Sequence, residues 1–466
     1  MKGSQSADIS LAPAVYVETY GCQMNVADSQ LVMGILRRAG YQRVEQPDQA
    51  DVILLNTCAI REHAEERVLG RLSDLARLRN RRPELKLGLL GCMAQHDRQT
   101  LLQKAPYLDL VAGPDTYARL PQMLRQANFD PIVDVRLNRD ETYAGVVPEH
   151  EPNAVRAYVT VMRGCDEFCA FCVVPYVRGR ERSAAPDAVI DEVQALARRG
   201  VKEIVLLGQT VNAYRHGETG FAELLRMVCA VDGIERVRFT SPHPRFMSSA
   251  VIDAIASEPK VQPYLHLPVQ SGSDRVLQTM ARGYRVGEYR ALVERLRAAI
   301  PELALSTDII VGFHGENDDD FEATLELLRE VSFDSAFIFK YSLRENTKAY
   351  RLGDTVSETE KGERLATAIA LQERISLLCN QRLVGRDFPV LIEGEARRGN
   401  GMLSGKTPQF KTAVFPASDG LGPGDTVLVR VESVTSHSLR GAPAKAPLQA
   451  GSAPEVRRPT GEMPTV

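Results

Sequence analysis

The sequence has none of the features of a membrane or exported protein. It contains no apolar run of the roughly 18 residues needed to cross a bilayer, so we expect no membrane-spanning helix and no membrane partner. Residues 1–6 lead into no apolar core of a signal peptide. We therefore expect a cytoplasmic protein in a reducing compartment.

Neither sign of charge dominates the chain. Lys and Arg number 57 and Asp and Glu number 60, which gives a net charge of −3. A nucleic-acid partner would therefore have to bind at a local basic patch. Hydrophobic residues make up 44% and charged residues 25% of the 466 residues, close to the average of a folded globular protein, which excludes disorder over most of the length.

An α/β pattern runs through most of the chain. At about 100–200 residues per domain, the length predicts about two to four domains. Residues 14–130 alternate between strand-like and helical segments, which is typical of a parallel sheet covered by helices. Residues 131–150, rich in Pro, Asp and Glu, are expected to be a linker. The strands of the first domain are expected at 15–20, 51–56, 85–90 and 109–111.

The alternation resumes over residues 151–383, where helical stretches separate six strand candidates. Six βα units in this length predict a complete or partial barrel, with its site at the carboxyl ends of the strands. The six candidates are 157–163, 201–207, 236–240, 264–267, 305–311 and 335–341.

The pattern changes again near residue 384, to short strands separated by Gly, Pro and Asp turns. Residues 384–446 are expected to form a small all-β module, a five-stranded barrel. Eight Lys and Arg against six Asp and Glu make this module mildly basic. Residues 447–466, rich in Pro, Ala and Gly, are expected to be a disordered tail.

Three of the eight cysteines lie close together in the sequence. Cys165, Cys169 and Cys172 form a CxxxCxxC run directly after the first strand of the second domain. Three thiolates at this spacing can hold one 4Fe–4S cluster and leave its fourth iron open to a chelating small molecule. The alternative is a zinc site with a distant fourth ligand, or unligated thiols. Structural zinc usually uses paired CxxC elements, and the sequence has no second pair.

Three further cysteines share a position rather than a motif. Cys22, Cys58 and Cys92 each follow the end of a predicted strand, at separations of 36 and 34 residues. Because the carboxyl ends of parallel strands converge on one edge, the three thiols are expected to meet there. The alternative is three unrelated buried cysteines. Cys229 and Cys379 fit helical patterns and are expected to be core thiols.

The residues around both groups of cysteines carry a family resemblance. CxxxCxxC with Phe171 before its last cysteine resembles the radical S-adenosylmethionine (SAM) superfamily. Its flanks, MRGCD at 162–166 and VPYVRGRE at 174–181, resemble the methylthiotransferases. The contexts of the three earlier cysteines, TYGCQMN, NTCAIRE and GCMAQ, are similar to the tRNA 2-methylthio-N6-dimethylallyladenosine synthase branch. The small β module is similar to a TRAM domain.

The resemblance implies a tRNA-modifying transferase with two 4Fe–4S clusters per chain. Cys165, Cys169 and Cys172 would hold the cluster that binds SAM, the methyl donor and radical source. The auxiliary cluster would lie on Cys22, Cys58 and Cys92. The implied reaction is methylthiolation at C2 of N6-isopentenyladenosine at position 37, beside the tRNA anticodon. That carbon has no leaving group, so its C–H bond requires radical chemistry supplied by a cofactor.

The resemblance also implies partners and alternatives. The partners are tRNA carrying the isopentenylated base, an electron donor such as flavodoxin or ferredoxin, and an iron–sulfur assembly system. The alternatives are the same chemistry on a ribosomal-protein aspartate or on threonylcarbamoyladenosine, and a non-catalytic RNA-binding iron–sulfur protein.

Strand-end residues of the predicted barrel are candidates for binding SAM, because barrel ligands come from these positions. Arginines beyond the cysteine loop are candidates for contacts with RNA phosphate. The SAM candidates are Phe171, Gln209, Asn212, Ser241, Gln270, Ser271 and Gly312, and the RNA candidates are Arg178, Arg180 and Arg182.

Two loops depart from the family pattern by lacking prolines. His314 stands where the family usually has Pro, and residues 343–346 replace a Pro-containing segment. Losing a proline loosens a loop by under about 1 kcal/mol. Because both loops are expected to face the active site, any effect should fall on the positioning of the substrate.

Overall fold

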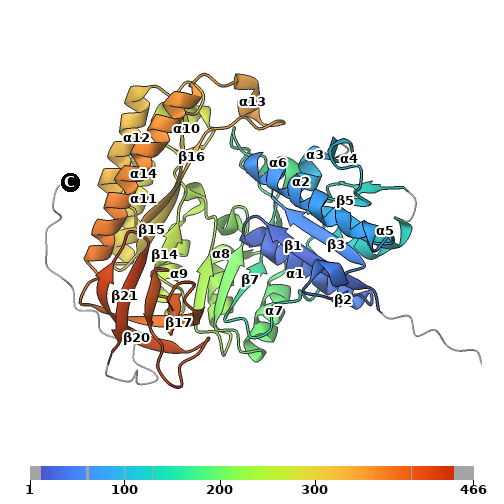
Figure 1. The fold of residues 1–466 in the computed structure, drawn as a ribbon. Helices are drawn as coiled ribbons and strands as arrows, with labels where there is room; N and C mark the ends of the chain where they lie inside the picture. Colours follow the sequence, from blue (N-terminus) through green and yellow to red (C-terminus); the bar gives the residue numbers. More distant parts are fainter. Residues whose placement is uncertain (1–11, 59–61, 99, 128–129, 400, 445–466) are drawn as a thin grey trace, which may run out of the picture.

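A computed structural model describes residues 12–58, 62–98, 100–127, 130–399 and 401–444. The chain forms an N-terminal α/β part, a central α/β part and a small C-terminal barrel (Figure 1). This confirms the fold class predicted from the sequence. The predicted tail, 447–466, lies outside the described residues. Within the described ranges, no helix is long and apolar enough to cross a membrane.

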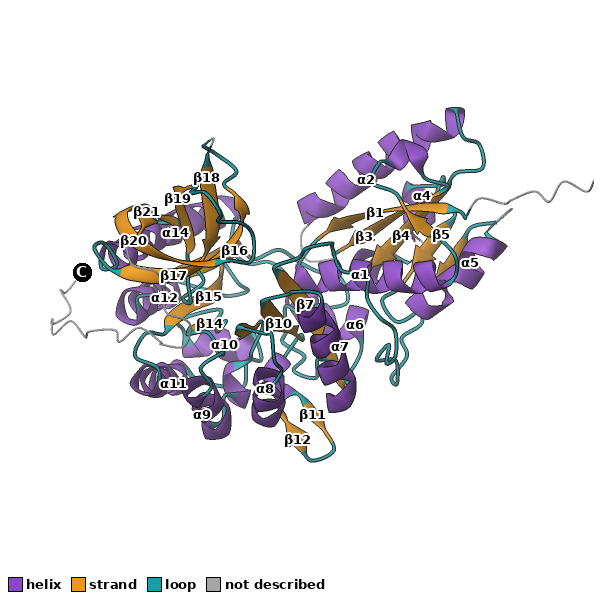
Figure 2. Ribbon diagram, turned by 90° about the horizontal axis from the view of Figure 1, so that it is seen from below, coloured by secondary structure: helices purple, strands orange, loops and turns teal. Residues whose placement is uncertain are grey.

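The N-terminal part is a six-stranded parallel sheet with helices on both faces (Figure 2). Two apolar cores, one on each face, hold the layers together. One face is covered by α1 (Gln23–Arg38) and α5 (Leu120–Gln126), and the other by α2 (Glu62–Ala76), α3 (Cys92–Asp97) and α4 (Thr100–Lys104). In sheet order the strands are β2 (Gln42–Arg43), β1 (Ala14–Tyr20), β3 (Val52–Thr57), β4 (Lys86–Gly91), β5 (Leu110–Ala112) and β6 (Ile132–Asp134).

Two edge strands of this sheet, β2 and β6, were not predicted. They are two and three residues long, too short for an alternating pattern to appear in the sequence. β6 corrects the prediction that 131–150 is only a linker, because it pairs with β5 and extends the sheet. Tyr143, later in that segment, is buried and stacks on Tyr117 with ring centroids 6.0 Å apart.

The central part is an open barrel made of two three-stranded parallel sheets. A bridge between Val237 and Val261 connects the sheets, and helices pack outside them around one large apolar core. The strands are β7 (Arg156–Thr160), β10 (Glu203–Leu207) and β13 (Arg236–Phe239), then β14 (Tyr264–His266), β15 (Ala304–Val311) and β16 (Ser335–Lys340). The outer helices are α7 (Pro186–Arg198), α8 (Phe221–Cys229), α9 (Ser249–Ser257), α10 (Asp274–Thr279), α11 (Val286–Ala299), α12 (Asp318–Val331) and α14 (Glu358–Gln381). The short helix α13 (Lys348–Leu352) packs instead on the cysteine loop, where Ala349 N donates to the Ala170 carbonyl at 2.8 Å.

The first predicted barrel strand, 157–163, is divided in the structure. β7 ends at Thr160, and β8 (Met162–Arg163) pairs antiparallel with β9 (Arg182–Ser183). The loop bearing Cys165, Cys169 and Cys172 and the helix α6 (Val174–Arg178) lie between β8 and β9. The short antiparallel pair therefore closes the base of the cysteine loop. A second such pair, β11 (Arg215–His216) with β12 (Thr219–Gly220), lies after β10.

The C-terminal part is a closed five-stranded barrel. Its loops dock on the central part through a buried cluster of charges. Glu203, with a fully buried side chain, pairs with Arg156 and Arg238, and Arg238 donates to the barrel carbonyls of Thr407 and Pro408 at 3.0 and 2.8 Å. The barrel is thus fixed to the strands of the central part. Its strands are β17 (Asp387–Glu395), β18 (Met402–Lys406), β19 (Thr412–Pro416), β20 (Thr426–Val434) and β21 (Ser438–Pro443).

Candidate active site

The first group of cysteines lies at the carboxyl edge of the N-terminal sheet. Tyr20 pairs with Thr57 across β1 and β3, and Thr57 pairs with Gly91 across β3 and β4. Each of these paired residues is followed by a cysteine: Cys58 comes directly after Thr57, Cys92 directly after Gly91, and Cys22 two positions after Tyr20. The parallel register therefore brings the three cysteines together. Cys22 caps α1 and Cys92 begins α3, where the helix dipole favours an ionised thiol.

The three thiols interact with one another. Hydrogen bonding to Cys58, opposed by burial and aided by the charge of Arg178, lowers the pKa of Cys22 to about 6 and that of Cys92 to about 7. Hydrogen bonding to both neighbours and burial raise the pKa of Cys58. The structure therefore brings these three predicted site residues into one group, in which Cys22 and Cys92 ionise more readily than a free thiol and Cys58 less readily.

Gly91 is the residue that lets the chain turn from β4 into Cys92. Its φ is +93°, and a Cβ there would lie 2.4 Å from Asn56 Oδ1 and 2.5 Å from the Thr57 carbonyl oxygen. A side chain would also be strained at this φ. The position of Cys92 therefore depends on glycine at 91.

If Cys22, Cys58 and Cys92 hold a cluster, as the sequence predicts, Gly91→Ala should lower the iron content of the protein, because Cys92 must move away from the other two thiols. The measurement is iron and sulfide per chain after anaerobic reconstitution. Gly287→Ala, where a Cβ would meet no atom within 4 Å, is the matched control and should retain the wild-type iron content. Equal iron in both variants would contradict the prediction.

The second group lies on the loop after β8. Cys165 Sγ is 3.1 Å from Thr210 Oγ1, just past β10, and Cys169 Sγ accepts a hydrogen bond of 3.2 Å from Arg282 Nη1. The loop backbone is anchored by Ala170 N, which donates to the Met280 carbonyl at 2.8 Å. Burial raises the pKa of Cys165 to about 11 and that of Cys172 to about 12, so these thiols need a positive partner to ionise.

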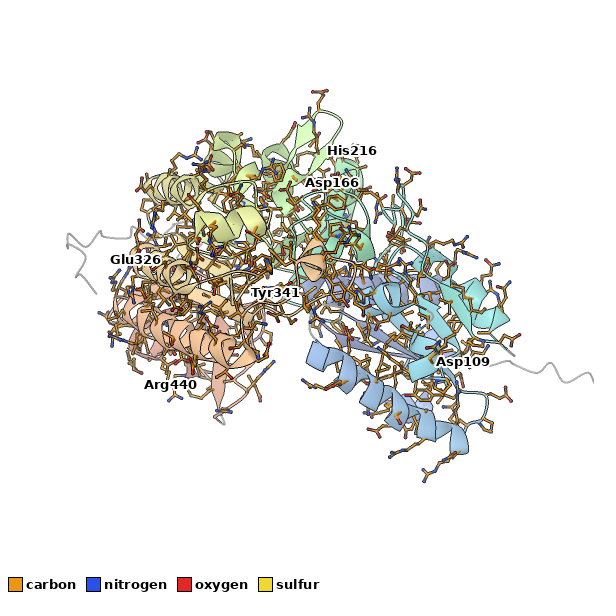
Figure 3. All side chains as sticks on the ribbon, turned by 90° about the horizontal axis from the view of Figure 1, so that it is seen from above. Asp109, Asp166, His216, Glu326, Tyr341 and Arg440 are labelled. Carbon is orange, nitrogen blue, oxygen red and sulfur yellow. The ribbon has the colours of Figure 1, made fainter. Side chains whose placement is uncertain are left out.

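Helix α6 joins the two groups of cysteines, because it follows the loop of the second and packs on α3, which begins at Cys92 of the first. Cys92, Val173 and Val177 form a small apolar cluster at this contact. Figure 3 shows Asp166, on the loop, and Tyr341, after β16, near the middle of the molecule, with Asp109 of the N-terminal part off to one side. Both groups therefore belong to the interface between the N-terminal and central parts.

The SAM candidates lie at the strand ends of the central part, around the cysteine loop. Gln209 follows β10, Ser241 follows β13, Gln270 and Ser271 follow β14, and Gly312 follows β15. Ser241 and Gln270 have φ of +58° and +79°, and Phe168 on the loop has φ of +47°. A non-glycine residue held in this backbone conformation costs about 1–3 kcal/mol, and such residues cluster at functional sites.

Some of these candidates are already engaged within the protein. Asn212 Nδ2 donates to the His243 carbonyl at 2.9 Å, and Asn212 Oδ1 accepts from the His243 backbone N–H at 2.8 Å. Ser271 Oγ contacts Thr324 Oγ1 at 3.4 Å, and Gly312 packs on the stem of Lys361. These three residues therefore shape the strand ends, and their contact with SAM stays a prediction.

Two other residues at the strand ends have a buried polar atom without a partner in the described part of the chain. Gln209 Oε1 and Tyr341 Oη are buried and have no hydrogen-bond partner within the described ranges. An unpaired buried polar atom costs about 1–3 kcal/mol, which a bound ligand would offset. Phe171 packs edge-on to Phe313 with ring centroids 6.4 Å apart, and Phe313 in turn packs on Tyr341. The donor set of three loop thiols, orphaned polar atoms and an aromatic wall fits a cluster with SAM bound to it.

The three arginines predicted to contact RNA differ in their surroundings. Arg182 is buried and bonds both oxygens of Asp115, at 2.8 and 3.1 Å. Arg178 is buried against Asp28 and Cys92. Phosphate contact by either would require breaking a buried ion pair. Arg180 is exposed and pairs with Asp166, so it is the one of the three that RNA can reach without rearrangement.

Four residues around the cysteines were missed by the sequence reading. Thr210 and Arg282 contact the loop thiols, while Asp28 and Arg163 form a buried ion pair of 2.9 Å across the two parts. Thr210 adjoins the predicted Gln209 and could have been found from its place after β10. Arg163 lies in the MRGCD flank that carries the family resemblance and could have been found from it, whereas Asp28 and Arg282 belong to ordinary helical or loop patterns and carry no sequence signal.

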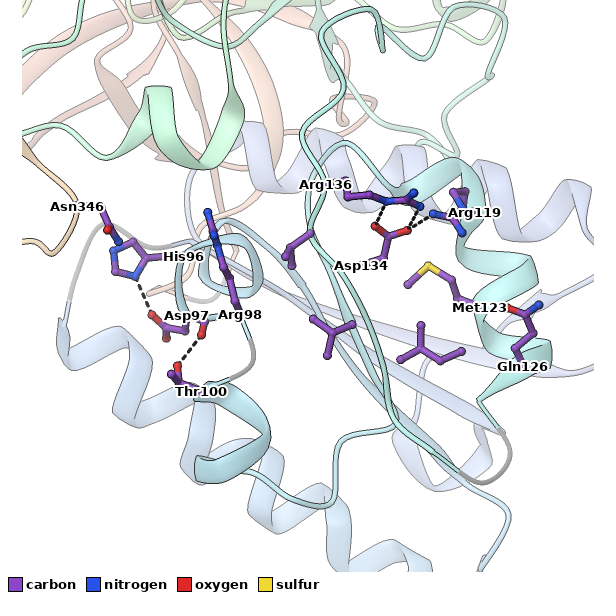
Figure 4. Close-up of a pocket in the computed structure, with 13 residues that line it drawn as sticks. His96, Asp97, Arg98, Thr100, Arg119, Met123, Gln126, Asp134, Arg136 and Asn346 are labelled. Atoms are coloured by element: carbon purple, nitrogen blue, oxygen red, sulfur yellow. Dashed lines mark hydrogen bonds and ion pairs between the residues drawn. The ribbon is translucent and has the colours of Figure 1, made fainter.

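The two loops that lack the family's prolines are held by other contacts. His314 Nδ1 lies 3.2 Å from the Gly353 carbonyl. The 343–346 segment reaches the N-terminal part, where His96 Nε2 lies 3.4 Å from the Glu345 carbonyl. Asn346 lines a pocket of about 760 Å³ together with His96, Arg98 and residues of α5 and β6 (Figure 4).

No three His, Cys, Asp or Glu side chains in the described ranges are arranged to hold a single metal ion. A structural zinc site gathers four such ligands about one point. All eight cysteines are free thiols. Three thiolates, which each group supplies, can hold a 4Fe–4S cluster and leave one iron open.

Known families match the three parts of the chain in order. Residues 14–113 match the description "Uncharacterized protein family UPF0004", residues 159–328 the radical SAM superfamily, and residues 381–443 the TRAM domain. Among solved structures, the radical SAM methyltransferase TsrM from Kitasatospora setae has a TM-score of 0.55 at 11% identity, covering 88% of this chain and 82% of its own. At that identity the likeness shows a shared fold.

Curated relatives match over nearly the whole length. A tRNA-2-methylthio-N(6)-dimethylallyladenosine synthase of Chlorobium luteolum is 45% identical over 439 residues, covering 92% of this chain and 96% of its own. One of Porphyromonas gingivalis is 42% identical over 454 residues, covering 95% and 98%. The family predicted from the cysteine motifs is thereby confirmed. This chain belongs to the tRNA-2-methylthio-N(6)-dimethylallyladenosine synthase family, whose members are radical SAM transferases that use SAM and a 4Fe–4S cluster.

Proposed function

We propose that this protein methylthiolates C2 of N6-dimethylallyladenosine at position 37 of tRNA, beside the anticodon. The observation that carries the proposal is the identity of 42–45% to synthases of that name over more than nine-tenths of both chains. The meeting of two groups of three cysteines at one domain interface supports it further.

Two clusters per chain are part of the proposal. Cys165, Cys169 and Cys172 would hold one, and Cys22, Cys58 and Cys92 the other. When bound, the first supplies the reductive cleavage of SAM that generates a radical able to break a C–H bond, and the second supplies sulfur. The chain's own contribution is to bring both sets of ligands to one interface.

The protein residues orient and shield the reacting groups. Gln209 and Tyr341 offer unpaired polar atoms to SAM, and Phe171 with Phe313 forms an apolar wall beside the loop. Arg282 donates a hydrogen bond to Cys169 and fixes the position of this thiol. Burial of Cys165 and Cys169 limits the access of water to the loop thiols.

The substrate tRNA and the other partners follow from this chemistry. Exposed arginines of the C-terminal barrel, Arg430 and Arg440, are suited to bind phosphate without reading sequence, as is Arg180 (Figure 3 labels Arg440). Reductive cleavage needs a one-electron donor, for which we propose flavodoxin or ferredoxin. Cluster loading needs an iron–sulfur assembly system. All of these partners are found in the cytoplasm, where we propose that the protein acts.

The test is reconstitution with iron and sulfide without oxygen, followed by incubation with SAM, reductant and isopentenylated tRNA. The masses of the nucleosides from the digested tRNA are then measured by mass spectrometry. We expect a methylthio group on the isopentenylated adenosine. An unchanged nucleoside, with 5′-deoxyadenosine accumulating, would overturn the substrate or the sulfur assignment while leaving the SAM chemistry in place.

A further inference from the structure

Arg178 connects the two groups of cysteines. It is the last residue of α6, six positions after Cys172, and its Nε donates a hydrogen bond of 3.2 Å to Cys92 Sγ in the other group. Its Nη1 lies 2.6 Å from Asp28 Oδ2 on α1. The side chain is 3% exposed, so these contacts are not those of a surface arginine.

The charges at this contact do not balance within the protein. Arg163 pairs with the other oxygen of Asp28 at 2.9 Å, so two guanidinium groups share one carboxylate. The Tyr143 ring, 4.8 Å from the Arg163 guanidinium, offsets part of that charge on the Arg163 side only. Asp115 is occupied by Arg182. A buried excess cation is costly unless an anion faces it.

The anion in contact with Arg178 is the sulfur of Cys92. Thiolates that ligate a cluster, and the cluster's own sulfides, are negative and accept N–H hydrogen bonds. Arg178 Nη2 has no hydrogen-bond partner among the residues the structure describes, so this group can donate to another acceptor beside Cys92. The unbalanced charge and the spare donor therefore both favour an anionic sulfur centre at this place.

We propose that Arg178 is a positioning residue of the auxiliary cluster: fixed by Asp28, it holds Cys92 and raises the reduction potential of the cluster on Cys22, Cys58 and Cys92. The inference rests on the proposed function, which places a cluster on these cysteines. A cationic donor stabilises the more negative, reduced state of a cluster, and hydrogen bonds to its sulfurs set its potential. Because α6 directly follows the SAM-cluster loop, the same side chain fixes the two sites relative to each other.

The test compares Arg178→Met with Arg163→Met in the full-length reconstituted protein. Both variants remove one arginine from Asp28, but only Arg178 touches a cysteine. The readout is the midpoint potential of the auxiliary cluster from a redox titration followed by electron paramagnetic resonance. A variant with Cys165, Cys169 and Cys172 changed to Ala assigns the signal. We expect a more negative potential in Arg178→Met and a wild-type potential in Arg163→Met.

Equal potentials in wild type and Arg178→Met, or equal shifts in the two variants, would overturn the inference. If Arg178→Met does not fold, Arg178→Lys is measured instead, because lysine keeps the charge beside Asp28 but loses the forked donor. A smaller shift of the potential in the same direction is then expected. An unchanged potential in Arg178→Lys would overturn the inference. Wild-type protein that binds only one cluster, with about four irons per chain, would instead refute the two-cluster part of the proposed function, and the inference with it.

Discussion

Changing Cys169 to alanine is expected to abolish the cleavage of SAM, measured as 5′-deoxyadenosine formed under reducing conditions. Cys169 is the middle thiol of the CxxxCxxC loop and the acceptor of the Arg282 hydrogen bond. Losing one of three ligands leaves a cluster that cannot be held with one iron open to SAM. Mutating a residue that only supports a metal ligand already lowers metal affinity or activity by about 10–100-fold. Loss of a ligand itself should therefore lower the rate of SAM cleavage by more than about 100-fold.

The matched control for Cys169 is Cys229→Ala. Cys229 is also a buried cysteine, but it lies at the end of α8 in the apolar core and contacts neither group of site cysteines. This control should form 5′-deoxyadenosine at close to the wild-type rate. If Cys169→Ala retained cleavage near the wild-type rate, Cys169 would not be a ligand of the SAM cluster.

Cys58→Ala is expected to separate the two halves of the reaction. Cys58 hydrogen-bonds to both Cys22 and Cys92, so its loss should release the auxiliary cluster that we propose on these three cysteines. The loop cysteines belong to another segment of the chain and should still bind their own cluster. We therefore expect 5′-deoxyadenosine to form while the methylthio product falls by more than about 100-fold.

The control for Cys58 is Cys379→Ala, a half-buried cysteine on α14, away from both groups. The measurement follows both products in one reaction, 5′-deoxyadenosine by chromatography and the modified nucleoside by mass. A Cys58→Ala protein that still makes the methylthio nucleoside would remove the auxiliary-cluster assignment. Loss of both products together would mean that the two sites are not separable.

These experiments matter because the two sites share an interface. The Asp28 carboxylate on α1 holds Arg163 and Arg178 of the central part, and Arg182 reaches back to Asp115. Removing one partner of such a buried pair costs about 3–5 kcal/mol. These ion pairs therefore connect the two parts of the chain that carry the two groups of cysteines.

Local patterns were sufficient for much of the fold. The alternation of apolar strands and helices predicted a parallel sheet, a complete or partial barrel and a small β-barrel, because each pattern reflects the burial of its own segment. The placement of Cys22, Cys58 and Cys92 after three strands predicted their meeting, since parallel strands end on one edge. The SAM and RNA contacts remain predictions from position.

Only the tertiary structure decided what joins these segments. β6 completes the first sheet from within the predicted linker, because a three-residue edge strand shows no periodicity and gains its stability by pairing with β5. Arg178 and Arg182 look like surface residues in the sequence, yet they are buried by partners on another domain. Asp28 and Arg163 lie 135 residues apart. The sequence by itself determined the two sets of thiols, whereas domain docking determined the charges that surround them, since no local pattern encodes a contact at that separation.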